Sequence, residues 1–231
     1  MALITSPITL HAKGILFDMD GILISSIGSV ERSWHAWATK NGVDPELAIH
    51  TAHGCRAIET IGKLRPDLDQ LAELKWIEDL EIEDQEGISV LPGVLQLIAS
   101  LPLGRWTVVT SATGRLARVR LAAGGVLPPA DFISADAVPQ GKPNPAPYLR
   151  GAELLGFAPA DCVVFEDSGS GVRSGHAAGC TVVATTFSHP PHELEKANYL
   201  ITDLTQVTVD TTPGGLVIHL APKAVANPLT C

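Results

Sequence analysis

The sequence predicts an α/β protein: a Rossmann-like parallel sheet with helices on both faces, plus a small inserted helical cap domain. Two patterns support this fold class. Short apolar runs alternate with helical segments between residues 106 and 201, as in parallel sheets with crossover helices. The block of residues 25–89 contains helical patterns only. We therefore expect a catalytic core of residues 1–24 and 90–210, the cap at 25–89, and a loose C-terminal tail at 211–231.

The first strand is the apolar run of residues 15–17, whose uninterrupted apolar character is typical of a strand buried in a parallel sheet. Asp18 and Asp20 follow it directly, and Gly21 allows the chain to turn. Two carboxylates this close at the end of a buried strand are costly unless a cation or a lysine compensates them. Because ligands bind at the carboxyl edge of such sheets, this turn is the first candidate site.

The cap is predicted from apolar residues at helical spacing. A helix over residues 25–41 ends before a glycine, two shorter helical pieces occupy residues 44–64, and another helix covers residues 69–86. One face of this last helix is acidic, and we expect it to be a solvated surface; its residues are Glu73, Glu78, Asp79 and Glu83.

The core resumes with a helix over residues 92–101. Further strands are expected at residues 106–110, 132–133, 162–165, 181–184 and 199–201, separated by helices that end near residues 123, 155 and 178. The chain beyond Thr211 contains proline and glycine and is weakly patterned, which predicts the loose tail.

The composition limits the function. A net charge of −9 over 231 residues argues against a nucleic-acid partner, which would need a basic patch. No apolar stretch is long enough to cross a bilayer, and the first residues lack a secretory signal, so we expect a cytoplasmic protein with no membrane partner. The four cysteines are scattered. Cys162 and Cys180 are expected to be small buried residues, although the even number of cysteines also allows a disulfide.

Polar side chains follow several predicted strands, and the carboxyl ends of parallel strands meet at one edge of a sheet. These residues are Asp18, Asp20, Ser111, Lys142 (in a loop before a helix), Glu166 and Asp167. Oxygen ligands from few side chains suit Mg²⁺, whereas a lysine, a hydroxyl and main-chain amides can bind a phosphoryl group. One carboxylate could attack phosphorus, and its neighbour could protonate the leaving oxygen and then activate water.

Four segments together resemble the motifs of the haloacid dehalogenase superfamily of phosphatases and phosphomutases. In chain order they are D-M-D-G, T-S-A, G-K-P-N-P and V-V-F-E-D-S, and the likeness extends over residues 13–204 with the helical insert at the place of that superfamily's small cap. The resemblance implies that Asp18 is the nucleophile and a Mg²⁺ ligand. It implies that Asp20 is the general acid and base, which also lends its main-chain carbonyl to Mg²⁺.

The same resemblance assigns the remaining residues of the core. Ser111 and Lys142 would bind the phosphoryl group, and Asp167 would be the further Mg²⁺ ligand. Glu166 would either bind Mg²⁺ directly or support the ligands from behind, and we favour the supporting role.

Within the superfamily, H-G-C-R-A-I-E-T-I and G-K-P-N-P-A-P-Y-L look most like phosphatases of sugar and polyol phosphates, of the 2-deoxyglucose 6-phosphate and glycerol phosphate type. By that resemblance Arg56 and His53 would reach from the cap to the substrate, with Thr113 as a third contact. The alternative for Arg56 is a helix-start arginine that faces water. We expect a monomer or weak dimer that acts on a small phosphorylated sugar or polyol.

Two other functions use the same fold. A β-phosphoglucomutase-like phosphomutase would share the core, but those relatives carry a histidine on the first cap helix where this chain has Val30, or Glu31 in a shifted register. That difference favours hydrolysis. A non-catalytic sugar-phosphate-binding protein is the second alternative, although all the chemical residues are present.

Two further interpretations are weaker. Gly169, Gly171 and Gly175 only partly match a dinucleotide-binding fingerprint, and they come too late in the chain. Histidine pairs that could bind zinc lack a third ligand at suitable spacing; they are His50 with His53, and His189 with His192.

Overall fold

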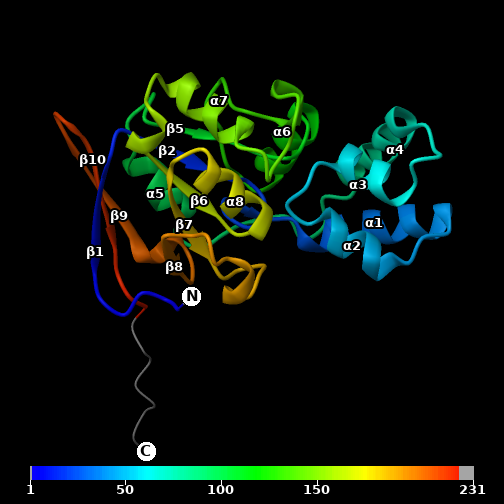
Figure 1. Cartoon of the computed structure of the whole chain (residues 1–231), viewed down its shortest axis with the longest axis horizontal. Coiled ribbons are helices and arrows are strands. Elements are labelled where there is room, and N and C mark those ends of the chain that lie inside the picture. Colours follow the sequence, from blue (N-terminus) through cyan, green and yellow to red (C-terminus); the bar gives the residue numbers. More distant parts are fainter. Residues whose placement is uncertain (1, 224–231) are drawn as a thin grey trace, which may run out of the picture.

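The computed structural model describes residues 2–223 and is built around a five-stranded parallel sheet in the order β5-β2-β6-β7-β8 (Figure 1). Its strands are β2 (Gly14–Phe17), β5 (Trp106–Val108), β6 (Cys162–Glu166), β7 (Thr181–Thr185) and β8 (Tyr199–Ile201). The parallel α/β core is therefore confirmed. The strand expected at residues 132–133 is only an isolated bridge between Val109 and Ile133.

Helices cover both faces of this sheet because its strands alternate their side chains. Ile15 and Phe17 of β2 pack on one face with residues of α5 (Val94–Ser100) and α6 (Gly114–Ala123). Leu16 packs on the opposite face with residues of α7 (Ala146–Leu155) and α8 (Gly169–Ala177). Short 3₁₀ turns complete the core at Ala135–Ala137, Pro159–Asp161, Pro191–Glu193 and Leu204–Gln206.

The loose tail expected from residue 211 is wrong as far as the described residues extend. β9 (Val207–Thr212) and β10 (Gly215–Leu220) form a hairpin, and β10 also pairs antiparallel with β1 (Ile8–Ala12). Alternate residues of β10 are buried against the core, so the strand is held by packing as well as by its ladder; these residues are Leu216, Ile218 and Leu220. Residues 224–231 lie outside the described part of the chain.

The cap consists of α1 (Ile27–Asn41), α2 (Pro45–Ala52), α3 (Ala57–Leu64) and α4 (Gln70–Glu83). Its helices enclose a hydrophobic cluster of their own that includes Trp34, Trp37, Ile61 and Ile77. Both connections to the core pass through a two-stranded ribbon of β3 (Ile24–Ser25) and β4 (Ser89–Val90). The cap lies to one side of the sheet, with α4 against α6 of the core (Figure 1).

The acidic face of α4 is only partly the solvated surface that the sequence predicted, since Glu83 is exposed whereas Glu73, Glu78 and Asp79 are half-buried. The Thr113 hydroxyl of the core donates a hydrogen bond to Glu78, and the guanidinium of Arg115 lies 2.7 Å from a carboxylate oxygen of Asp79. Acidic residues of α4 thus face polar and basic residues of α6 across the junction between cap and core.

Cys162 and Cys180 are buried and free, as expected, and Cys55 is free and half-buried. Within residues 2–223, no helix has the length and apolar character needed to cross a bilayer.

Candidate active site

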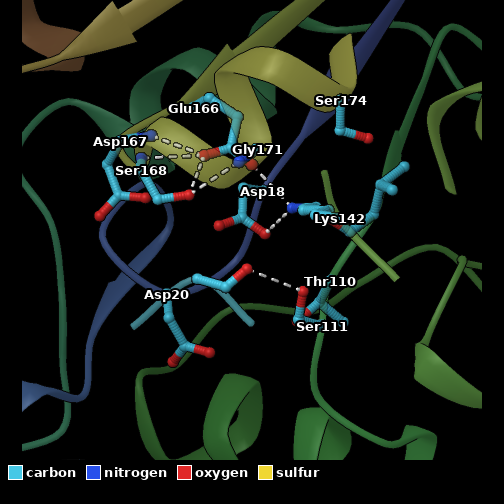
Figure 2. Close-up of polar contacts among 12 residues, drawn as sticks. Asp18, Asp20, Thr110, Ser111, Lys142, Glu166, Asp167, Ser168, Gly171 and Ser174 are labelled. Carbon is cyan, nitrogen blue, oxygen red and sulfur yellow. Dashed lines mark hydrogen bonds and ion pairs between the residues drawn. The ribbon is translucent and has the colours of Figure 1, made fainter. Parts of the chain in front are cut away.

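The register of the sheet brings the acidic residues together. Phe17 of β2 pairs with Val108 of β5 on one side and with Phe165 of β6 on the other. Asp18 and Glu166 are the next residues of their strands, so they lie beside each other at the carboxyl edge. Figure 2 shows their carboxylates around the amino group of Lys142.

Lys142 is fully enclosed and compensates two of these carboxylates. Its amino group lies 2.7 Å from a carboxylate oxygen of Asp18 and 2.7 Å from one of Glu166, and it donates to the Val109 carbonyl at 3.0 Å. Burial alone would lower the pKa of Lys142, but the two neighbouring charges outweigh burial and raise it. The lysine therefore carries its charge at neutral pH.

Glu166 is saturated with hydrogen bonds from the protein. Its Oε1 accepts from Lys142 and from the Tyr148 hydroxyl at 2.8 Å, while its Oε2 accepts from the main-chain amides of Asp167 and Ser168 and from the Ser168 hydroxyl. Burial would raise the pKa of Glu166, but the charge and hydrogen bond of Lys142 lower it below the ordinary value. With its lone pairs in use, Glu166 has little capacity left for another ligand.

A glycine makes room for this carboxylate. A Cβ atom at position 171 would lie 1.6 Å from Oε1 of Glu166, so only glycine fits at this turn of α8. The glycines that suggested a dinucleotide fingerprint therefore include one that serves the acidic cluster.

Asp18 and Asp167 have more negative charge around them than the protein neutralises. Burial raises the pKa of Asp18 to about 7, even though Lys142 opposes the shift, and burial together with the charges of Glu166 and Asp18 raises the pKa of Asp167 well above its usual value. Asp167 accepts a hydrogen bond from the Ser188 hydroxyl.

This cluster fits a divalent cation. One oxygen each of Asp18, Glu166 and Asp167 lie within 4.8 Å of one another. Three carboxylates share one lysine, and a hard cation with oxygen ligands supplies the missing positive charge. Since Glu166 is saturated, Asp18 and Asp167 are the side chains that fit the role of ligands.

Asp20 is held by one side chain at the start of the cap helix α1 and by one from the core helix α6. Its carboxylate accepts a hydrogen bond from Ser26 and another from the Arg120 guanidinium at 3.0 Å. In Figure 2 this carboxylate points away from Asp18. Ser26 is the N-cap position of α1, yet its hydroxyl makes no capping bond, because it is directed to Asp20 instead.

The carboxyl edge opens into a cavity of about 110 Å³ between core and cap. Its walls include Asp18, Asp20, Ser111 and Asp167 from the core, and Val30, Trp34, His53 and Glu81 from the cap. The hydroxyl of Ser111 donates to the Gly54 carbonyl of the cap at 3.3 Å. The cap thus stands directly over the acidic cluster.

The three residues expected to contact substrate lie in two different cavities of the structure. His53 lines the cavity. Arg56 does not: its guanidinium donates to the Pro139 carbonyl at 3.2 Å and lines a neighbouring cavity, so it neither faces open water nor reaches the acidic cluster. Thr113 also lines that neighbouring cavity, and its hydroxyl is bonded to Glu78.

Several residues of the site escaped sequence reasoning: Ser26, Glu81, Arg120, Tyr148 and Ser188. Arg120 and Glu81 lie in helices and reach the site only because α6 and α4 meet, a contact that no local pattern reveals. Tyr148 stands in the G-K-P-N-P-A-P-Y segment, one helical turn beyond the lysine loop, where its partner could have been suspected. The histidines considered for zinc form no cluster of three potential ligands within residues 2–223.

Comparison with known proteins identifies the family. The model of the haloacid dehalogenase-like hydrolases matches residues 12–179. The chain belongs to this family. It is 39% identical to hexitol phosphatase A of Escherichia coli (strain K12), over 90% of this chain and 99% of that protein. It is 36% identical to glycerol-1-phosphate phosphohydrolase 2 of Saccharomyces cerevisiae, over 81% of this chain and 80% of that one.

Solved structures of this haloacid dehalogenase-like hydrolase fold superpose well. CbbY of Rhodobacter sphaeroides in complex with phosphate gives a TM-score of 0.74 at 21% identity, over 84% of this chain and 96% of that one. β-Phosphoglucomutase of Clostridium difficile gives 0.73 at 20% identity, over 85% and 93%. At these identities the likeness supports the fold alone, and inferences about chemistry rest on the sequence relatives.

Proposed function

We propose that this chain is a Mg²⁺-dependent phosphatase that hydrolyses small sugar or polyol phosphates through a phosphorylated Asp18. The observation that carries the proposal is the acidic cluster bridged by Lys142, which lies at the carboxyl edge of the sheet and faces a cavity closed by the cap. The relatives of more than 30% identity named above, a hexitol phosphatase and a glycerol-1-phosphate phosphohydrolase, support the reaction class and the substrate class.

Asp18, Asp167 and the main-chain carbonyl of Asp20 would hold Mg²⁺, with Glu166 fixing the lysine and the adjacent amides behind them. Bound there, the cation would offset charge on the phosphoryl oxygens. Lys142 and the Ser111 hydroxyl would hold the same group and keep it in line for attack.

The protein residues then carry the two steps. The oxygen of Asp18 that Lys142 does not engage attacks phosphorus while the bond from phosphorus to the leaving oxygen breaks, and Asp20 gives its proton to that oxygen. In the second step Asp20 removes a proton from water, the water oxygen attacks phosphorus, and the bond to Asp18 breaks to release phosphate. Asp20 must turn away from Arg120 and Ser26 to reach the reacting atoms.

Hydrolysis is favoured over phosphoryl transfer between sugar positions by the cap wall. Val30, which corresponds to the histidine of the mutase relatives that this sequence resembles unless the register shifts to Glu31, lines the cavity. Its side chain cannot donate a hydrogen bond that would keep the phosphorylated Asp18 waiting for a sugar. We place the enzyme in the cytoplasm as a monomer or weak dimer that acts on small molecules and has no nucleic-acid partner.

The test is phosphate release from a panel of sugar and polyol phosphates, in Mg²⁺ and in chelator. Asp18→Asn removes the nucleophile and changes one atom, and Asp210→Asn, an exposed aspartate on β9, is the matched control. We expect release that needs Mg²⁺, survives in Asp210→Asn and is lost in Asp18→Asn. Release that persists in chelator, or in Asp18→Asn, contradicts the proposal.

A further inference from the structure

The end of the cavity beside Asp20 is formed by one buried guanidinium, one buried carboxylate and the partly exposed carboxylate of Asp20. Arg120 donates to Asp20 at 3.0 Å, and its other terminal nitrogen lies 3.2 Å from a carboxylate oxygen of Glu81. Arg120 and Glu81 are each only 4% exposed, so water screens this charge poorly. Burial raises the pKa of Glu81 to about 7. Above that pH two carboxylates share the single positive charge of Arg120, which then has none to spare for a third anion.

The rest of the described wall offers no other strong cation. Among the described residues that line the cavity, Arg120 is the only arginine or lysine. The larger apolar side chains of the wall are Val30 and Trp34 from the cap and Leu116 from α6. Burial and the nearby His189 lower the pKa of His53, which favours its neutral form. Arg56, the cap arginine that could have served, is held at the Pro139 carbonyl outside this cavity.

We propose that Glu81, acting with Arg120, selects substrates whose leaving group carries no charge and excludes bisphosphates and phosphorylated carboxylic acids. The inference rests on the proposed function, since it concerns the group that remains after phosphate is removed. A second anion at this end of the cavity would approach Glu81 at low dielectric, and Arg120 could compensate it only by releasing Glu81 or Asp20. The hydroxyl groups of a polyol meet no such cost, because they can donate to Glu81 and accept from Arg120.

The opposite end of the cavity carries both signs of charge. His53 and His189 also border an outer groove of about 460 Å³, whose walls include Lys63, Arg173 and Lys196 but also Glu193 and Glu195. The outer groove therefore offers a charged leaving group no uniformly positive wall.

The experiment is run at pH 8, where the Glu81 carboxylate is ionised, and compares kcat/KM for a hexitol monophosphate with kcat/KM for phosphogluconate and for a hexose bisphosphate. Glu81→Gln keeps the shape of the side chain and removes its charge. Asp79→Asn removes one charge from the same helix, two residues away and outside the cavity, and serves as the matched control. We expect wild type and Asp79→Asn to favour the hexitol substrate. In Glu81→Gln the ratio of charged to uncharged substrate should rise about tenfold, which corresponds to ~1.4 kcal/mol.

The outcomes are separable from failure of the proposed function. If wild type hydrolyses none of these compounds, the proposed function fails first. If wild type hydrolyses hexitol and charged substrates equally well, or if Glu81→Gln and Asp79→Asn raise the ratio by the same factor, the proposed function stands and the role of Glu81 is overturned. A second variant, Glu81→Met, tests whether the effect of Glu81→Gln comes from a hydrogen bond of the new glutamine, and a thermal unfolding measurement checks that it is folded. We expect the same rise in the ratio of charged to uncharged substrate. If the ratio does not rise in folded Glu81→Met, the charge argument is contradicted.

Discussion

Replacing Lys142 by methionine should expose how much the lysine contributes to stability. The change keeps the length of the side chain but removes three interactions: ion pairs with Asp18 and Glu166 at 2.7 Å and a hydrogen bond to the Val109 carbonyl at 3.0 Å. Breaking a buried ion pair by removing one partner costs about 3–5 kcal/mol, because it leaves an uncompensated charge. A buried carbonyl left without a donor adds about 1–3 kcal/mol. Protonation of the carboxylates relieves part of this cost, so we expect a loss of about 3–5 kcal/mol.

The assay is equilibrium unfolding in urea with chelator present, so that a bound cation does not replace the missing charge. Lys13→Met is the matched control, because Lys13 makes one ion pair with Asp161 at 2.9 Å and its side chain is 50% exposed. Exposed pairs of this kind contribute about 0–1 kcal/mol. If Lys142→Met destabilises the protein no more than Lys13→Met does, the reasoning about the buried cluster is refuted.

Two further predictions concern stability. A Gly→Ala change inside a helix would usually stabilise it by up to about 1 kcal/mol, but at Gly171 the new methyl group meets Glu166, so we expect Gly171→Ala to lose about 1–3 kcal/mol in urea unfolding. The control is Gly62→Ala in α3, which meets only the flexible end of Gln70 and should be neutral or stabilising. Equal effects of the two substitutions would contradict the packing argument. Burial raises the pKa of Glu81 from 4.5 to about 7. Between pH 4.5 and pH 7 the folded protein therefore keeps a proton on Glu81 that the unfolded chain has lost. The stability that this proton contributes is complete below pH 4.5 and is lost as the pH rises through about 7. Between pH 5 and pH 8 the free energy of unfolding should therefore fall less in Glu81→Gln than in wild type, by on the order of 3 kcal/mol. Parallel plots of the free energy of unfolding against pH for the two proteins would show that Glu81 ionises normally.

The core of the site could be predicted because its residues follow strands. Asp18 and Glu166 each come directly after a buried apolar run, and the rule that parallel strands end at one edge places them together without any knowledge of side-chain geometry. The same rule places Ser111 at the end of β5 and in the cavity wall. The sequence alone does not show which carboxylate supports the site and which can bind a cation. That distinction follows from the hydrogen bonds of Glu166, which depend on Tyr148 and on the space left by Gly171.

The errors have physical causes of a different kind. Residues 207–220 alternate apolar and polar side chains about a Pro-Gly turn, which is a hairpin signal, but the partner strand lies near the other end of the chain. The sequence predicted a solvated acidic face on α4 because the basic residues opposite it belong to α6. The sequence of neither helix determines the angle at which the cap meets the core. The position of Arg56 in a neighbouring cavity could not be predicted for the same reason: it depends on the loop that carries Pro139.

The most direct test of the account is to trap the phosphorylated residue. An aryl phosphate can transfer its phosphoryl group without a general acid, because the phenolate leaves unaided, so Asp20→Asn should form the phosphoenzyme and then fail to hydrolyse it. After rapid acid quench, peptide mass spectrometry should find one phosphoryl group on Asp18 of that variant, and none on the same peptide of an Asp18→Asn, Asp20→Asn double variant. Phosphate on another residue, or substrate turnover by Asp20→Asn with Asp18 never modified, would contradict the central claim.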